Sequence, residues 1–200
     1  MFTAAPGLRE FKEKQEAARI ARDVREAEER DAELRALPLA GLGLRVSGAI
    51  DAELAVNLPT LVRVEQPQPD DESADPSSEW YDPYAAQPTL VVRISAFDGE
   101  RPWLGDHQFN EWAIYVPGYH GDGTYDLGAI HREREERNMA PDYLDWYLSI
   151  DDAEEDFYFD AYSDAPGTVT VADGGRSLTV AMTMSGASGA LTASANVRLA

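Results

Sequence analysis

The sequence predicts a mainly β protein, an antiparallel β-sandwich preceded by one long charged α-helix, with a closed β-barrel as the alternative. Three observations lead to this fold class. The spacing of apolar residues changes from three or four to two after Pro38, glycine-rich turns separate the short alternating segments, and charge is divided unevenly along the chain. We therefore expect a charged helical segment, residues 1–38, and an acidic β-domain, residues 39–200.

The uneven charge separates the two parts. Residues 9–35 hold 8 basic and 9 acidic side chains, a net charge of −1. The whole chain holds 17 and 37, a net of −20, which leaves 9 and 28 for the rest, a net of −19. A strongly acidic domain is a poor partner for nucleic acid and for anionic lipid. Basic proteins, cations and neutral ligands remain as partners.

The helix is predicted over residues 8–37, where oppositely charged side chains recur four residues apart and Pro38 ends the pattern. The apolar stripe of this helix is thin and covers about two imperfect heptads. Such a helix lies across its own domain, stands as an arm, or docks on a partner or a second copy as a coiled coil. The residues that would make a docking contact are Ile20, Val24, Ala27 and Leu34.

Strands are indicated by alternation of apolar and polar residues. The clearest three are consecutive at the C-terminus, where Asp173-Gly174-Gly175 supplies a turn that needs positive φ. Their apolar face and their Ser/Thr face predict a meander with one buried and one wet side. The expected strands lie at residues 44–51, 90–95, 111–116, 143–150, 156–160, 169–171, 177–185 and 191–199.

Two insertions interrupt the strands. Residues 66–87 carry four prolines and a run of acidic residues, so we expect a mobile acidic loop. Residues 131–138 form a charged insert of one or two helical turns. From Pro117-Gly118 to the C-terminus, the turn glycines and the closing meander are similar to small bacterial secreted or lipoprotein β-sandwiches of unknown function, a resemblance that implies a fold and no functional residue.

One loop and one acidic run are candidates for calcium. Residues 116–126 combine three glycines with Asp122 and Asp126, and Ca²⁺ binds carboxylate and carbonyl oxygens on flexible backbone. The run that contains Asp151, Asp152 and Glu154 concentrates negative charge that a cation would stabilise. The alternative is a hairpin connection and a turn whose polar side chains simply face water. No other cofactor is expected.

Aromatic residues in polar loops are candidates for a contact surface. Trp80 and Tyr81 lie in the acidic loop, and Trp103 follows Pro102 in another loop. Such side chains either plug the open end of a sandwich or stack on a sugar or a protein partner.

Catalytic signatures are missing from the sequence. The chain has no Cys and no Gly-x-Ser-x-Gly, and no phosphate-binding loop follows its glycines. His107, His120 and His131 match no zinc spacing and are expected at the surface. We therefore expect a protein that is not an enzyme.

The function predicted is that of a structural, adaptor or binding protein, in which the helix docks or self-associates and the acidic domain meets a basic protein or a larger assembly. Two alternatives stay open: an inhibitor, immunity protein or nucleic-acid mimic acting through the acidic face, and a calcium-assisted carbohydrate-binding module. No signal peptide or membrane span is visible between Met1 and Leu61, so we expect a cytoplasmic protein.

Overall fold

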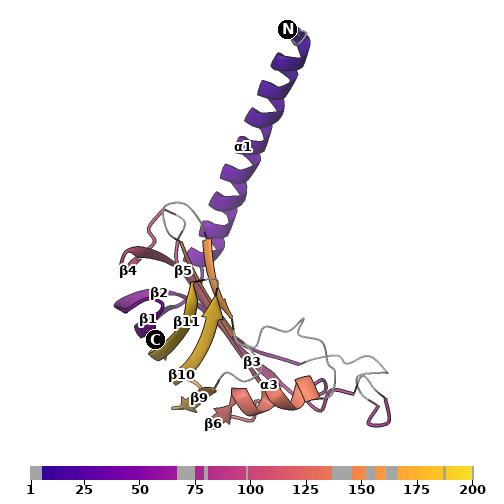
Figure 1. Cartoon of the computed structure of the whole chain (residues 1–200), viewed down its shortest axis with the longest axis vertical. Helices are drawn as coiled ribbons and strands as arrows, with labels where there is room; N and C mark the ends of the chain where they lie inside the picture. The colour runs from indigo at the N-terminus through magenta and orange to yellow at the C-terminus, as the bar shows by residue number, and fades with distance from the viewer. Residues whose placement is uncertain are drawn as a thin grey trace. The chain divides into compact units, whose positions relative to one another are not determined.

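The computed structural model describes residues 6–66, 75–78, 81–97, 99–136, 146–151, 156–160, 166–186 and 188–199. The chain divides into two compact units, Met1–Ala36 and Leu37–Ala200. The first unit contains one helix and the second contains an antiparallel β fold (Figure 1). The expected mainly β architecture with one long N-terminal helix is confirmed. Among the described residues, no helix is long and apolar enough to cross a membrane.

The N-terminal helix α1 spans Pro6–Arg35. Ion pairs along its surface join side chains three or four residues apart, at 2.6 Å for Glu16–Arg19, 3.6 Å for Arg22–Glu26 and 3.8 Å for Asp31–Arg35. Such pairs support a helix locally, without tertiary contacts. The helix ends two residues earlier than expected, because the residue before a proline avoids the α conformation and Pro38 lies only three residues beyond Arg35.

The described residues of the second unit form strands and one helix, α3 (Leu127–Glu136). The strands are β1 (Leu39–Gly48), β2 (Ala52–Glu65), β3 (Thr89–Ser95), β4 (Trp103–Leu104), β5 (His107–Pro117), β6 (Gly123–Asp126), β7 (Trp146–Asp151), β8 (Asp156–Asp160), β9 (Gly167–Ala172), β10 (Ser177–Gly186) and β11 (Gly189–Leu199).

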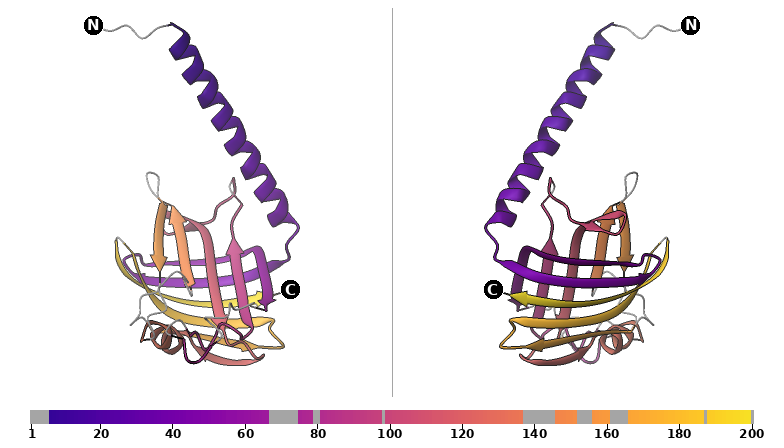
Figure 2. Two further views of the ribbon diagram at one scale, coloured as in Figure 1. Left: turned by 90° about the vertical axis from the view of Figure 1, so that its right-hand side faces the viewer. Right: turned by 90° about the vertical axis from the view of Figure 1, so that its left-hand side faces the viewer.

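The strands form two layers that cross each other, as Figure 2 shows. The first layer contains β6, β9, β10, β11, β1 and residues 52–59 of β2, and the second contains residues 60–65 of β2 followed by β3, β5, β7 and β8. Strand β2 therefore belongs to both. It bends where Leu58, Pro59 and Thr60 are all buried, and the Thr60 hydroxyl donates to the carbonyl of Leu58 at 3.0 Å. Bends of this kind make the corners of crossed sheets.

The core lies between the layers. Alternate residues of β1, β10 and β11 are buried, as expected for strands with one wet face. The largest fully buried side chains are Trp112, Phe109 and Phe159, all from the second layer. Helix α3 adds Leu127, which has no exposed surface.

The sheet is sandwich-like and not closed. Neighbouring strands pair in turn from β11 through β1 to β8, and β8 pairs with β10. Within the described residues, however, β8 and β10 meet in one residue pair, Asp160 with Ser185. One pair is too short a joint to make a continuous barrel wall.

Three strands and the first four residues of one helix were not expected from the sequence. β2 was missed because Pro59 interrupts its alternation, and β4 and β6 are only two and four residues long. Helix α3 begins at Leu127, four residues before the charged insert that was predicted. Of the predicted acidic loop, residues 75–78 and 81–87 are described and contain turns, while most of residues 67–80 lie outside the described part.

Candidate functional site: a tyrosine–arginine cluster on the second layer

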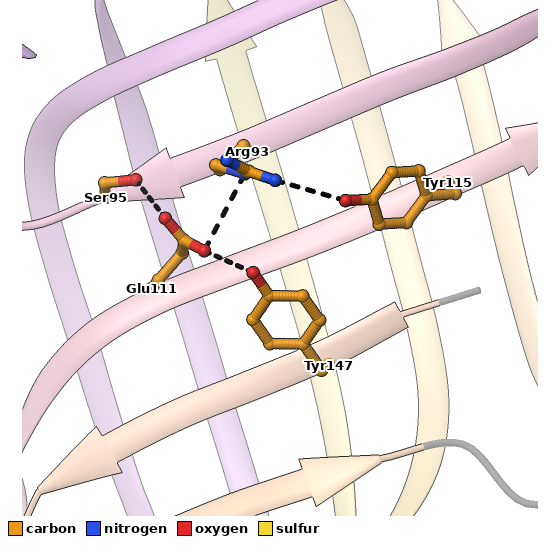
Figure 3. Close-up of polar contacts among 5 residues, drawn as sticks. All are labelled: Arg93, Ser95, Glu111, Tyr115 and Tyr147. Atoms are coloured by element: carbon orange, nitrogen blue, oxygen red, sulfur yellow. Dashed lines mark hydrogen bonds and ion pairs between the residues drawn. The ribbon is translucent and has the colours of Figure 1, made fainter. Parts of the chain in front are cut away.

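Five polar side chains meet on the outer face of the second layer, and we call them the Tyr–Arg cluster (Arg93, Ser95, Glu111, Tyr115 and Tyr147) (Figure 3). They come from β3, β5 and β7, whose alternation places apolar residues such as Val92, Ile94 and Trp112 in the core and the polar residues between them outside. The register between these strands then determines which of the polar side chains lie next to one another.

The register centres the cluster on Ala113 of β5. Ala113 pairs with Arg93 of β3 and with Tyr147 of β7, while Glu111 pairs with Ser95. Residues opposite one another in antiparallel strands have side chains about 5 Å apart, so long side chains from three strands reach each other here.

Glu111 is the centre of the hydrogen-bond network. Its Oε2 accepts from the Ser95 hydroxyl at 2.7 Å, and its Oε1 accepts from the Tyr147 hydroxyl. The Arg93 Nε lies 3.7 Å from the same Oε1, and the Arg93 Nη2 donates to the Tyr115 hydroxyl at 3.2 Å. Each of the five side chains thus has a polar partner within the cluster (Figure 3).

The cluster is partly buried. The Arg93 side chain is 41% exposed and that of Glu111 18% exposed, while Ser95 is buried. Burial, together with the hydrogen bond to Glu111 and the negative charge of that carboxylate, raises the pKa of Tyr147 well above its usual value. For Arg93, burial acts to lower the pKa, but the bond to Tyr115 and the charge of Glu111 outweigh it and the pKa rises.

These conditions favour binding over proton transfer. A phenol with a raised pKa stays neutral at ordinary pH, and so Tyr147 is a hydrogen-bond donor and not a base. Arg93 and Tyr115 keep exposed surface while their polar ends are fixed on neighbouring strands. The arrangement presents an aromatic and guanidinium surface in a fixed geometry.

The two loop aspartates of the calcium prediction have protein partners. Both carboxylate oxygens of Asp122 accept from backbone N–H groups, those of Gly174 at 2.9 Å and Gly175 at 3.1 Å. Asp126 precedes α3 and accepts from the N–H of Ala129 at 2.9 Å, the contact of a helix N-cap. The calcium site stays a prediction. A Ca²⁺ ion bound by Asp122 would compete with the hydrogen bonds from Gly174 and Gly175.

The acidic run that was predicted to bind calcium is described only at its ends. Asp151 is the last residue of β7 and pairs with Asp156, whereas Asp152 and Glu154 lie outside the described residues. Within the described part of the chain, no three His, Asp or Glu side chains gather as a metal site would require.

The predicted partner-binding residues differ in exposure. In α1, Ile20 and Val24 are 51% and 53% exposed, Ala27 is partly buried and Leu34 is buried. Trp103 is 62% exposed and Tyr81 is partly buried, and Trp80 lies outside the described residues. Of the histidines expected at the surface, His131 is buried because it lies on the covered side of α3.

The Tyr–Arg cluster was not found from the sequence. The alternation in residues 90–95 and 111–116 shows that Arg93, Glu111 and Tyr115 lie on outer faces, which was a usable signal. The pairing of β3 with β5 and of β5 with β7 depends on register, however, and one residue of slip would separate Glu111 from Ser95. No protein-family model, curated protein or solved structure matches this chain.

Proposed function

We propose that this is a non-enzymatic adaptor or binding protein of the cytoplasm whose Tyr–Arg cluster contacts another protein. The observation that carries the proposal is the fixed geometry of Arg93, Tyr115 and Tyr147 on three adjacent strands. Tyrosine and arginine dominate the energetics of protein interfaces. Side chains already held in place lose less conformational entropy on binding, which favours affinity.

The partner presents a basic surface. The net charge of −19 outside residues 9–35 attracts cationic proteins over long range and accelerates their association at low salt. The cluster itself holds one arginine and one glutamate, so the cluster supplies the close contact and the surrounding carboxylates supply the steering.

The test compares proteins captured from a lysate by the full chain and by two matched variants. Tyr115→Ala removes a partly exposed ring of the cluster, and Glu53→Gln changes an exposed carboxylate on the outer face of the first layer. We expect one set of basic proteins to be retained by the wild type and by Glu53→Gln and lost with Tyr115→Ala. Retention of the same set by Tyr115→Ala, with its thermal melt unchanged, would contradict the proposal.

Salt separates the steering from the contact. Raising the salt from about 0.1 M to 1 M shortens the screening length from about 10 Å to 3 Å. We expect the association rate to fall steeply and the dissociation rate to change little, because distant charges act mainly on encounter. If the captured protein is a nucleic-acid enzyme whose active site is blocked, the inhibitor or nucleic-acid mimic is the correct form of this proposal.

Self-association through α1 is the second candidate, favoured by the half-exposed Ile20 and Val24. They are four residues apart and so lie on one face of the helix. Light-scattering mass of the full chain and of the double variant Ile20→Ser, Val24→Ser tests this idea. An oligomer that becomes a monomer in the variant supports it, and a monomeric wild type at high concentration excludes it.

A calcium-assisted carbohydrate-binding module would use Trp103, which is 62% exposed. Stacking of a sugar on this ring would make Trp103→Ala lose binding while Tyr115→Ala retains it. An oligosaccharide array probed with both variants, with and without Ca²⁺, distinguishes this function from protein binding.

A further inference from the structure

Among the described residues, the last part of strand β2, residues 62–65, has no partner on one of its two edges. Residues 52–59 pair with β1, and residues 60–65 pair with β3 on the opposite edge. The N–H of Thr60 donates to the carbonyl of Pro38 at 2.9 Å, and Pro38 directly precedes β1. The backbone groups of Thr60 therefore point toward the edge on the β1 side. Because these directions alternate along a strand, Val62 and Val64 point their N–H and C=O groups toward the same edge.

The pairing on that edge stops at Pro38. β1 begins at Leu39, and among the described residues no strand lies beside Val62 and Val64 on the β1 side. The backbone N–H and C=O groups of Leu61, Arg63 and Glu65 point instead toward β3. The two N–H and two C=O groups of Val62 and Val64 therefore have no backbone partner in the described part of the chain, and such an edge is a template for another strand.

A groove of about 440 Å³ runs beside this edge. One wall is β2, and the other is the turn that joins β9 and β10, at Gly174 and Gly175. Apolar side chains lie along it, with Val64 46% exposed. They include Val62, Val64, Leu90 and Leu199. The inner side of an added strand would find apolar contacts here.

The charge of the groove differs from that of the unit around it. Arg63 and Arg176 line the groove, and none of its described lining residues is Asp or Glu, although the unit has a net charge of −19. Arg63 is paired with Glu65. The exposed guanidinium of Arg176 has no ion-pair partner among the described residues.

We propose that the edge of β2 at residues 62–65 binds an extended peptide segment of a partner protein as an added strand. Backbone hydrogen bonds to Val62 and Val64 hold the segment, alternate apolar side chains fill the groove, and one carboxylate of the segment pairs with Arg176. This mode of recognition obtains affinity from main-chain bonds and specificity from side-chain pockets. The site shares no residue with the Tyr–Arg cluster and does not depend on the function proposed for that cluster.

A second copy of the chain is a poorer occupant. Pairing of two identical edges is isologous, so the Arg63 and Arg176 of each copy would face those of the other. Two units of net charge −19 would also approach each other. A peptide with a single carboxylate avoids both the repulsion between arginines and the repulsion between two acidic units.

The test uses the full chain and a short synthetic peptide, acetylated and amidated, that alternates valine with threonine and carries one glutamate. We expect saturating peptide to slow hydrogen exchange at the amides of Val62 and Val64 by about tenfold or more, as new hydrogen bonds do. The amides of Leu61 and Arg63, already bonded to β3, are the internal controls and should not change. A peptide methylated on its backbone nitrogens should fail to bind.

Two variants locate the contact. Val64→Pro removes one outward N–H without touching the bonds to β3, and should weaken binding about tenfold. Val64→Thr keeps the N–H and should bind like the wild type. Arg176→Gln should weaken binding of the glutamate peptide but not of a glutamine peptide.

Three results would overturn the proposal: binding with unchanged exchange at Val62 and Val64, equal binding of the methylated peptide, or protection that appears without peptide as protein concentration rises, which would identify a second copy as the occupant. The two proposals can be told apart with Val64→Pro. If this variant still captures the lysate partners, those partners bind through the Tyr–Arg cluster, and failure of the peptide to bind β2 would not contradict that proposal.

Discussion

The two layers bury their inner faces alike but use their outer faces differently. On the first layer most of the outer residues are short and exposed, among them Gly43, Thr179, Ser194 and Asn196. They touch in pairs, as in the 3.2 Å bond from the Thr179 hydroxyl to Asn196. On the second layer long side chains bond across three strands and cover their small neighbours, so that Val91 is 1% exposed and Ala113 is fully buried.

This difference shows how a polar outer face acquires a partial core. The Tyr–Arg cluster encloses apolar atoms beneath it and its side chains bond to one another, so both packing and hydrogen bonding depend on a few residues. A face made mostly of short side chains has many weak contacts, so the loss of any one of them should lower stability only slightly. Substitutions in the shared core and on each outer face test this contrast.

The largest effect is expected in the core that both layers share. Trp112→Ala removes a fully buried ring and should lower the free energy of unfolding by about 3–5 kcal/mol, because the cavity left behind adds to the lost burial. Trp103→Ala is the control, since its ring is 62% exposed and its loss should cost about 0.5 kcal/mol or less. Urea unfolding measures both. Equal losses would mean that the core does not depend on Trp112.

A matched pair of glutamates compares the outer faces directly. Glu111→Ala leaves Ser95 and Tyr147 without their shared acceptor and Arg93 without its ion pair, and should cost about 1–3 kcal/mol. Glu53→Ala breaks an exposed ion pair with Arg45 on the first layer and should cost about 0–1 kcal/mol. If Glu53→Ala proves as costly in urea unfolding, the contrast between the faces is wrong.

The first layer has a stronger polar contact at its turn than on its face. Asp122→Ala removes two hydrogen bonds to Gly174 and Gly175 and should cost about 1 kcal/mol, because the site is exposed and water replaces part of the loss. Asp122→Asn keeps one acceptor and should cost less. Thermal melts of the two variants measure this difference, and identical melting temperatures would show that the link adds no stability.

The smallest effect is a dependence on alkaline pH. The pKa of Tyr147 is higher in the folded protein than the usual value of about 10, so the contribution of this group to stability is fully present below pH 10 and is lost as the pH rises above it. Tyr147→Phe should therefore lose less stability than the wild type between pH 9 and about 11. A parallel decline in the two proteins would show that Glu111 does not hold the phenol.

Periodicity in the sequence was sufficient to predict the elements that local patterns determine. The long charged helix, the wet-faced strands β10 and β11 and the turn at Asp173-Gly174-Gly175 were all indicated in this way. β2 was not, because Pro59 lies at a corner between layers where burial overrides alternation. The Tyr–Arg cluster was beyond reach because it needs the register of three strands, and the partner of Asp122 lies 52 residues further along the chain.

The pairing of β1 with β11 joins the first strand of the unit to its last. During synthesis about 140 residues are added between the end of β1 and the start of its partner β11. Until β11 is made, β1 can pair only with β2. Sheets whose pairings are this distant in sequence fold slowly and expose unpaired edges meanwhile. A ribosome-bound chain lacking β11 would therefore need protection from aggregation, and full protease resistance should appear only after the last strand is released.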